Sequence, residues 1–160
     1  MAREIERKFL VKRDAWTHDP SRGTLYRQGY LSADAARVVR VRIAGTAAYL
    51  TIKGQTAGIE RREFEYPIPV ADAATLLDEL CLRPIIDKTR YRVPFRGHVW
   101  EVDEFHGENE DLIVAEIELQ DPHATFDKPP WAGDEVSNDP RYFNSNLALH
   151  PYSRWSNAAR

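Results

Sequence analysis

Polar and apolar residues alternate in eight short segments of this 160-residue chain, and this alternation restricts its fold more than any other feature. A period of two residues is typical of β-strands that bury one face. Turn-forming stretches, such as residues 44–46, 54–58, 96–97 and 106–109, separate the segments and favour short antiparallel connections. The expected strands are residues 4–11, 24–31, 37–43, 48–53, 61–68, 87–93, 98–105 and 112–119.

Signals for helices are few. Apolar residues at helical spacing predict one amphipathic helix over residues 70–82. A second helix is expected over residues 141–150, because Asp139 can serve as its N-cap and Pro140 suits the first helical position. The expected fold class is therefore mainly β (α+β): a closed barrel of eight antiparallel strands with a few flanking helices, in a single domain spanning residues 1–160.

Charged residues fall on one side of the expected strands, because successive residues of a strand point to opposite faces. In the first strand Glu4, Glu6 and Lys8 share one face, whereas Ile5 and Phe9 share the other. The sign of the charge is also segregated by strand. The acidic sets are Glu4/Glu6, Glu63/Glu65, Glu101/Asp103 and Glu116/Glu118, and the basic sets are Arg40/Arg42, Lys53 and Lys88/Arg90/Arg92.

An ordinary sheet with its charged side in water explains any one of these strands at least as well. For the whole set, three features favour charges that face the inside of the barrel. The polar side contains few Ser, Thr, Gln or Asn residues, its signs are segregated, and the apolar side is rich in large residues that the helices could cover from outside. We therefore expect a polar, water-filled tunnel lined by acids and bases.

Such a tunnel predicts a highly charged ligand, because so many partly desolvated charges must neutralise one another or a bound molecule. Bases from several strands would hold an anion, and a linear triphosphate offers the oxygens that Arg and Lys side chains bind. Paired carboxylates would hold a hard cation such as Mg²⁺ or Mn²⁺. The sequence contains no GxxxxGK[ST] motif, which excludes a P-loop.

Composition excludes several other classes of function. The net charge of −3 predicts no nucleic-acid partner, and no apolar run is long enough to predict a membrane span. The charged N-terminal segment lacks the pattern of a signal peptide, and the single cysteine, Cys81, cannot form an internal disulfide. These features predict a cytoplasmic protein that acts on a small molecule.

Glu4-Ile5-Glu6-Arg7-Lys8 resembles the N-terminal ExExK signature of the CYTH or triphosphate tunnel metalloenzyme superfamily. Members of this superfamily are eight-stranded antiparallel barrels that hydrolyse or rearrange triphosphates with a divalent metal. The resemblance continues over nearly the whole chain, and the segment around Pro129-Pro130-Trp131 is similar to that of compact bacterial inorganic triphosphatases. Further matching motifs are Arg27-Gln28-Gly29-Tyr30-Leu31, Arg40-Val41-Arg42, Thr51-Ile52-Lys53, Lys88-Thr89-Arg90-Tyr91 and Ala115-Glu116-Ile117-Glu118-Leu119.

The resemblance implies a role for each tunnel residue. The implied phosphate contacts are Lys8, Arg40, Arg42, Lys53, Lys88 and Arg90. The implied metal ligands are Glu4, Glu6, Asp103, Glu116 and Glu118. Glu63 and Glu65 lie on the same side of their strand and are expected to orient the basic residues, with metal binding by this pair as the less favoured alternative.

Lys88 is the expected base that activates water, because a lysine among other cations has a lowered pKa and can accept a proton. Tyr30 is expected to be its hydrogen-bonding partner or an alternative acceptor, although it could also be a packing residue of the second strand.

The expected activity is metal-dependent hydrolysis of tripolyphosphate to pyrophosphate and phosphate. Hydrolysis of nucleoside or thiamine triphosphates and cyclisation of ATP stay open, because superfamily members share one tunnel. The sequence shows no obvious set of aromatic residues in the tunnel that would hold an organic group. A non-catalytic polyphosphate- or nucleotide-binding module is a further alternative, and pairing of two copies through exposed strand faces is expected to be possible.

Overall fold

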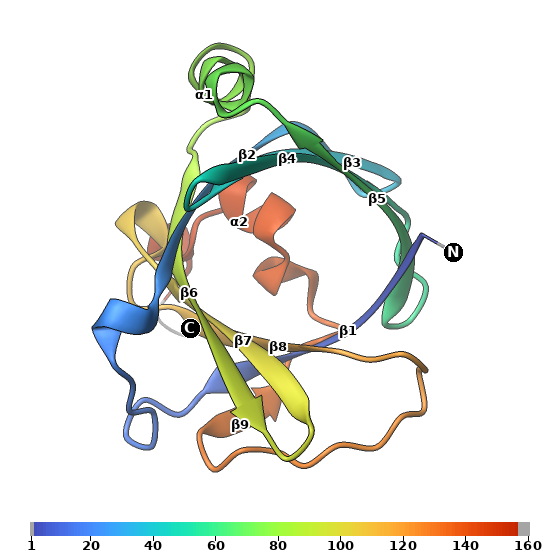
Figure 1. Ribbon diagram of the computed structural model, residues 1–160, viewed down its shortest axis with the longest axis vertical. Coiled ribbons are helices and arrows are strands. Elements are labelled where there is room, and N and C mark those ends of the chain that lie inside the picture. Colours follow the sequence, from blue (N-terminus) through green and yellow to red (C-terminus); the bar gives the residue numbers. More distant parts are fainter. Residues whose placement is uncertain (1, 157–160) are drawn as a thin grey trace.

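The computed structural model describes residues 2–156, and within them the chain forms a ring of β-strands (Figure 1). Two α-helices and four 3₁₀ turns accompany nine strands in this part of the chain. The strands are β1 (Arg3–Val11), β2 (Thr24–Asp34), β3 (Arg37–Ala44), β4 (Ala47–Gly54), β5 (Glu60–Ile68), β6 (Ile86–Phe95), β7 (His98–Phe105), β8 (Ile113–Glu118) and β9 (Ala132–Glu135). The helical segments are η1 (Pro20–Arg22), α1 (Val70–Glu79), η2 (Gly107–Asn109), η3 (Pro140–Tyr142), α2 (Asn144–Leu149) and η4 (Tyr152–Arg154).

Eight of these strands close into an antiparallel barrel, which confirms the expected fold class. The order around the ring is β5-β4-β3-β2-β6-β7-β8-β1, and pairing of β1 with β5 completes it. Strand β1 makes this closure by dividing one edge between two partners. Its first residues, Arg3–Ile5, pair with β5, whereas the short strand β9 pairs beyond them at Phe9 and Val11.

Local sequence explains several of the tight connections. Arg96 and Gly97 link β6 to β7, and both have positive φ angles, of 44° and 85°, as a two-residue type I′ hairpin requires. Gly45, with a φ of 61°, occupies the similarly short connection between β3 and β4. These turns set the register that aligns inward-facing side chains on neighbouring strands.

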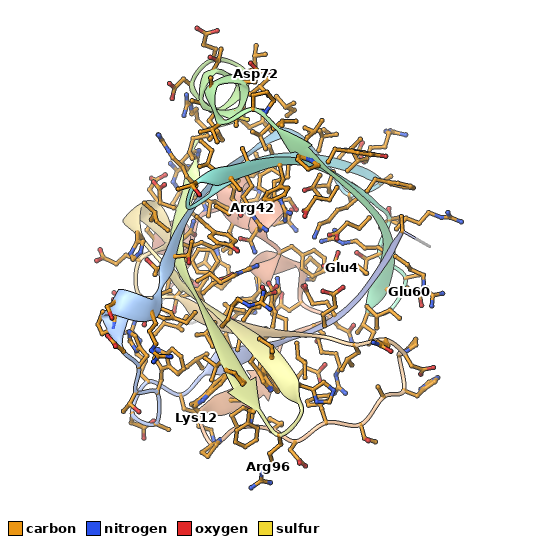
Figure 2. The ribbon with its side chains drawn as sticks, viewed as in Figure 1. Glu4, Lys12, Arg42, Glu60, Asp72 and Arg96 are labelled. Atoms are coloured by element: carbon orange, nitrogen blue, oxygen red, sulfur yellow. The ribbon has the colours of Figure 1, made fainter. Side chains whose placement is uncertain are left out.

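Apolar side chains cover the outside of much of the barrel, as the alternation predicts. Phe9, Trp100 and Ile117 are buried beneath β9 and the segment that contains Trp131. Helix α1 packs on β3 and β4, where Leu77 joins a second buried cluster. Figure 2 shows the opposite orientation for Glu4 and Arg42, which point into the ring.

This outer covering is incomplete, contrary to the expectation that helices cover the apolar side. Ile52 of β4 is 39% exposed, and on β5 Phe64 and Tyr66 are 38% and 53% exposed. Helix α1 lies over β3 and β4 but does not reach this part of the wall.

Both expected helices differ from the observed ones in extent. Helix α1 ends at Glu79 rather than at residue 82, because Leu80 leaves the helical conformation. The segment predicted as a helix over residues 141–150 contains the 3₁₀ turn η3 and the shorter helix α2, separated by extended backbone at Phe143. Asp139 does act as a cap, but for η3, where its side chain accepts a hydrogen bond from the Arg141 backbone N–H.

Helix α2 lies across the middle of the ring in Figure 1 and contacts β2 and β6. Leu147 of α2 is fully buried and packs in a cluster with Tyr30, Ile86 and Phe105. The C-terminal part of the chain therefore forms a floor at one end of the barrel. No helix among residues 2–156 is long and apolar enough to cross a membrane.

Candidate active site

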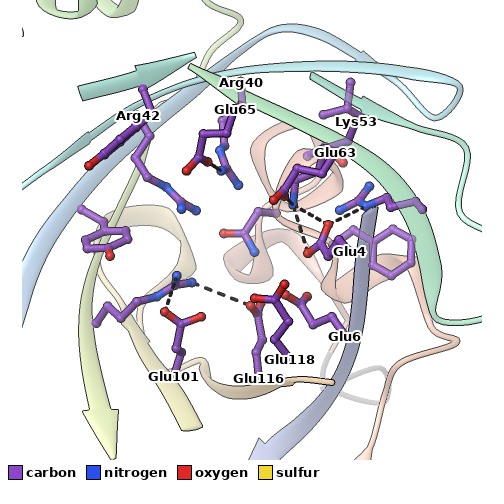
Figure 3. A pocket seen from close by; sticks show the side chains of 18 of the residues that line it. Glu4, Glu6, Arg40, Arg42, Lys53, Glu63, Glu65, Glu101, Glu116 and Glu118 are labelled. Atoms are coloured by element: carbon purple, nitrogen blue, oxygen red, sulfur yellow. Dashed lines mark hydrogen bonds and ion pairs between the residues drawn. The ribbon is translucent and has the colours of Figure 1, made fainter. Parts of the chain in front are cut away.

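The barrel encloses a cavity of about 290 Å³ whose lining is mostly charged (Figure 3). Every residue expected in the site lines this cavity, with the exception of Asp103. The complete lining consists of Glu4, Glu6, Lys8, Tyr26, Tyr30, Val38, Arg40, Arg42, Ala44, Tyr49, Lys53, Arg61, Glu63, Glu65, Lys88, Arg90, Glu101, Glu116, Glu118, Phe143, Asn144 and Ser145. The charged side of the strands therefore faces a common interior.

Four of the glutamates in the lining lie on the neighbouring strands β1 and β8: Glu4, Glu6, Glu116 and Glu118. Glu6 and Glu118 are direct partners in the register of these two strands. Within the described part of the chain, no ion pair joins either of them to a basic side chain. Like charges directly opposite each other destabilise a sheet, so this pair would be stabilised by a cation.

The pKa values of these glutamates follow from their neighbours. Burial and then the negative charges of Glu116 and Glu4 raise the pKa of Glu6 well above its usual range. Burial and Glu4 also raise the pKa of Glu118. Burial alone would raise the pKa values of Glu4 and Glu116 as well, but their basic neighbours together lower them. Lys53 and Arg61 act on Glu4, and Lys8, Arg90 and Lys88 act on Glu116.

Ion pairs hold Glu4 and Glu116 to the basic part of the lining. Glu4 Oε2 lies 3.0 Å from Lys53 Nζ and 3.3 Å from Arg61 Nε. Glu116 lies 3.4 Å from Lys8 Nζ and 3.8 Å from an Arg90 nitrogen. In this conformation no three acidic, His or Cys side chains of residues 2–156 are already grouped as a metal site. A cation bound here would therefore compete with these ion pairs for the carboxylates.

Arg40 carries an unused hydrogen-bond donor. Its Nη2 donates to Thr51 Oγ1 and Glu65 Oε2, at 3.1 and 3.3 Å. Its Nε is buried without a hydrogen-bond partner among residues 2–156, although Arg40 lines the cavity. Buried donors are nearly always paired in folded proteins, so this nitrogen favours an anionic ligand.

Glu63 and Glu65 contact basic residues of the lining. Glu63 lies 3.1 Å from Lys53, and Glu65 accepts hydrogen bonds from Arg40 and Thr51. Both are therefore placed to restrict basic side chains that reach into the cavity.

Arg42 is held without a carboxylate partner. Its Nε donates to Gln28 Oε1 at 2.8 Å, and no ion pair to Arg42 occurs among residues 2–156. Burial, followed by the positive charges of Arg40 and Arg90, lowers the pKa of Arg42 to about 10. Its positive charge is thus poorly compensated and available to an anion.

Lys88 lies at the floor of the cavity and is fully buried. Its Nζ donates to Asp103 Oδ2 at 2.7 Å and to Asn144 Oδ1 at 3.0 Å. Burial lowers the pKa of Lys88 to about 7, with Arg90 and Arg42 acting in the same direction against Asp103.

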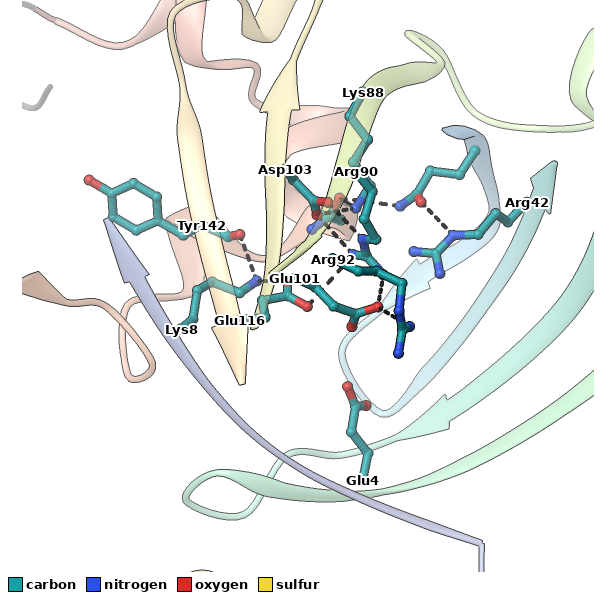
Figure 4. Close-up of polar contacts among 12 residues, drawn as sticks. Glu4, Lys8, Arg42, Lys88, Arg90, Arg92, Glu101, Asp103, Glu116 and Tyr142 are labelled. Atoms are coloured by element: carbon teal, nitrogen blue, oxygen red, sulfur yellow. Dashed lines mark hydrogen bonds and ion pairs between the residues drawn. The ribbon is translucent and has the colours of Figure 1, made fainter. Parts of the chain in front are cut away.

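Asp103 is occupied by basic partners rather than by the cavity (Figure 4). Arg90 donates to both of its oxygens, at 2.7 and 2.8 Å, and Lys88 donates to one of them. The carboxylate is 1% exposed and does not line the cavity. This geometry disagrees with the expectation that Asp103 binds metal, because its accepting positions face Arg90 and Lys88.

Tyr30 is linked to Lys88 through two side chains that the sequence did not indicate. Its hydroxyl accepts a hydrogen bond from Gln28 Nε2 at 3.0 Å, and the same nitrogen donates to Asn144 Oδ1 at 3.2 Å. Asn144 in turn accepts from Lys88. Gln28 lies two residues before Tyr30, so the alternation along the strand could have identified it as a residue of the inward face. Asn144 reaches the cavity only because α2 docks against the barrel, which no local pattern indicates.

Other lining residues were also missed. Arg61 pairs with Glu4. Glu101, which was expected on the inward face but was given no role, pairs with Arg90 at 3.3 Å. Tyr26 and Tyr49 line the cavity as well, so aromatic side chains are present where none were expected.

Comparison with known proteins places these features in context. Residues 2–152 match the CYTH domain family. An inorganic triphosphatase of Acetivibrio thermocellus is 52% identical over 155 residues, covering 97% of this chain and 99% of the relative. An inorganic triphosphatase of Nitrosomonas europaea is 36% identical over 151 residues, covering 91% and 97%. The crystal structure of the inorganic triphosphatase NE1496 superposes with a TM-score of 0.64 at 36% identity, covering 91% of this chain and 94% of that one.

Proposed function

The chain belongs to the CYTH domain family, and on that basis we propose that it hydrolyses inorganic triphosphate to pyrophosphate and orthophosphate with a divalent cation. The observation that carries the proposal is that one cavity contains both a hydrogen-bond donor without an acceptor and carboxylates without an ion pair. Among residues 2–156, the buried Nε of Arg40 has no acceptor, and Glu6 and Glu118, which line the same cavity, form no ion pair with a basic side chain. A triphosphate with its cation would supply both.

The carboxylates fit a hard cation such as Mg²⁺ or Mn²⁺, because these ions prefer oxygen ligands. Glu6 and Glu118 would hold it, with Glu4 and Glu116 close by on the same two strands. When bound, such an ion supplies charge neutralisation to the phosphate oxygens and orients them. We propose that Asp103 has a different role and positions Arg90 and Lys88.

Binding of the substrate would replace ion pairs that the protein makes with itself. Phosphate oxygens would bind Lys8 in place of Glu116, and Lys53 in place of Glu4. These two carboxylates would then be free to bind the cation. Anion and cation binding are therefore expected to favour each other. Arg40, Arg42 and Arg90 would complete the contacts to the phosphates.

Hydrolysis needs water to attack a terminal phosphorus while the bond to the bridging oxygen breaks. The products are orthophosphate and pyrophosphate, and the attacking water loses one proton. Positioning and stabilisation of charge account for most catalysis of such a phosphoryl transfer. We propose that neutral Lys88 Nζ accepts the proton, and that Tyr30 is tied to it through Gln28 and Asn144.

Organic triphosphates are less well supported as preferred substrates. Tyr26 and Tyr49 line the cavity, but the Tyr26 ring already contacts the guanidinium groups of Arg42 and Arg90. A nucleobase would compete with these contacts for the ring. A pure binding module is disfavoured because an anion alone would not relieve Glu6 and Glu118. A cytoplasmic location and pairing of two copies stay predictions.

A phosphate-release panel tests the proposal. The substrates are tripolyphosphate, ATP, thiamine triphosphate and longer polyphosphate, each with Mg²⁺, Mn²⁺ or EDTA, and cyclic AMP is assayed in parallel. We expect the highest kcat/KM for tripolyphosphate, equal amounts of pyrophosphate and phosphate, and no turnover in EDTA. Absence of turnover with either metal would favour the binding module, and cyclic AMP formation would favour a cyclase.

The proposed base is tested by the pH dependence of Lys88→Ala and Tyr30→Phe. For the unaltered protein kcat should rise with pH through about 7, because Lys88 must lose its proton before it can accept another. Lys88→Ala should remove this rise, whereas Lys12→Ala at an exposed position should keep it. Unchanged turnover in both Lys88→Ala and Tyr30→Phe would contradict the assignment.

A further inference from the structure

Tyr26 is a cavity residue to which the proposed reaction assigns no role. It lies on β2 and lines the cavity, two positions before Gln28 on the same face of the strand. The Arg42 guanidinium carbon lies 4.9 Å from the centre of its ring, and that of Arg90 lies 4.8 Å from it. One aromatic ring thus contacts two of the expected phosphate-binding arginines.

These two arginines need to be held near each other. Their charges repel, and the charge of Arg90 contributes to the lowered pKa of Arg42. Asp103 holds Arg90 through two hydrogen bonds, but Arg42 has no such carboxylate partner in the described residues. Arg42 is instead held by neutral groups, the Gln28 amide and the Tyr26 ring.

A neutral holder has an advantage in an anion site. A carboxylate would orient Arg42 but would also cancel its charge and compete with phosphate oxygens. An aromatic ring attracts a guanidinium through its quadrupole and leaves the edge donors of that guanidinium free. Holding the group before the ligand arrives reduces the entropy lost on binding.

We propose that Tyr26 is a positioning residue that holds Arg42 and Arg90 in place for the phosphate groups of the substrate. This inference rests on the proposed function for the identity of the anion. The property that matters is the ring and not the hydroxyl, since no hydrogen bond to the Tyr26 hydroxyl occurs among residues 2–156.

Two substitutions separate the ring from the hydroxyl. Tyr26→Leu should raise KM for tripolyphosphate about tenfold and leave kcat within about threefold, because cation–π contacts hold the substrate-binding groups and do not react. Tyr26→Phe should keep KM within about twofold of the unaltered protein, because it retains the ring. Tyr66→Leu is the matched control, since Tyr66 is 53% exposed on the outside of β5.

Calorimetric binding of tripolyphosphate in EDTA provides a second measurement that does not depend on turnover. The Leu variant should bind about tenfold more weakly, and the Phe variant should bind like the unaltered protein. Urea unfolding checks that each variant is folded, and Tyr26→Met serves as a second ring-free variant if the Leu variant is not. Equal weakening by Phe and Leu, or an unchanged affinity of both ring-free variants, would overturn the inference.

The outcomes also separate this inference from the proposed function. Binding that depends on the ring, without hydrolysis by the unaltered protein, would support Tyr26 while rejecting the triphosphatase. Hydrolysis with equal KM for the Leu, Met and Phe variants would reject Tyr26 and keep the triphosphatase. If the unaltered protein neither binds nor hydrolyses tripolyphosphate, both are rejected.

Discussion

Replacing Asp103 by Asn removes one negative charge from a buried cluster and leaves a side chain of nearly the same size. In the structure Asp103 is 1% exposed and accepts two hydrogen bonds from Arg90 and one from Lys88. The substitution leaves these two cations without their common counter-ion. It therefore tests whether Asp103 serves to hold the basic residues or to bind metal.

The magnitude follows from the surroundings of the cluster. Removing one partner of a buried ion pair typically costs about 3–5 kcal/mol of the free energy of unfolding. The lower end is expected here, because Glu101 and Glu116 remain 3.3 and 3.8 Å from Arg90. Lys88 can also lose its proton, since its pKa is already lowered to about 7. We expect a loss of about 3 kcal/mol for Asp103→Asn.

Urea unfolding in EDTA at pH 7 measures this loss. With a slope of about 2 kcal/mol per molar urea, the midpoint should fall by about 1.5 M. Asp87→Asn is the matched control, because Asp87 takes part in an exposed and long ion pair. Its side chain is 46% exposed, and its Oδ1 lies 3.7 Å from Arg27 Nε. Exposed ion pairs of this kind contribute about 0–1 kcal/mol to the free energy of unfolding, so the control substitution should shift the urea midpoint little.

The difference in the free energy of unfolding between Asp103→Asn and the unaltered protein should depend on pH. Arg90 and Lys88 outweigh the effect of burial, so that the pKa of Asp103 is lowered in the folded state. A lowered folded pKa means that the stabilisation is present above the unfolded pKa of about 3.9 and is lost as the pH falls below it. A loss below about 1 kcal/mol at pH 7, or unchanged stability with weakened Mg²⁺ affinity, would refute the positioning role.

Two further substitutions test the acidic pair and the packing of the wall. Glu6→Gln should abolish most metal-dependent turnover but raise the melting temperature in EDTA at pH 8, because the raised pKa of Glu6 shows that its charge is unfavourable there; a lower melting temperature would contradict this. Gly29→Ala should cost about 1–3 kcal/mol in urea unfolding. Its Cβ would lie 2.8 Å from Ile85 Cδ1 and 2.9 Å from Cys81 Cβ, whereas the control Gly54→Ala meets only Arg62 Cβ at 3.7 Å; equal effects would refute the packing argument.

The barrel could be predicted because its main signal is local. Alternation along a single strand shows which side chains share a face, and turn residues show where each strand ends. Short or interrupted elements were harder. Strand β9 has four residues, too few for an alternation to stand out, and the break at Phe143 depends on how α2 docks rather than on helical periodicity.

Asp103 shows that alternation along a strand predicts which face a side chain lies on, but not which partners it meets there. It shares the inward parity with Glu101, and the sequence offered no reason to separate them. The register places Asp103 opposite Arg90 and Glu101 opposite Arg92. As a result Asp103 is enclosed by bases at the floor, whereas Glu101 lines the cavity.

The sequence by itself determined the barrel, the face that carries the charges and nearly all the residues that meet inside. These depend on the two-residue period of a strand, which every segment expresses on its own. Only the tertiary structure decided which acid meets which base, that Tyr26 contacts two arginines, and that Asn144 reaches Lys88 from the C-terminal floor. Those contacts join residues distant in sequence, and they follow from strand register, barrel closure and the docking of α2, which no local pattern encodes.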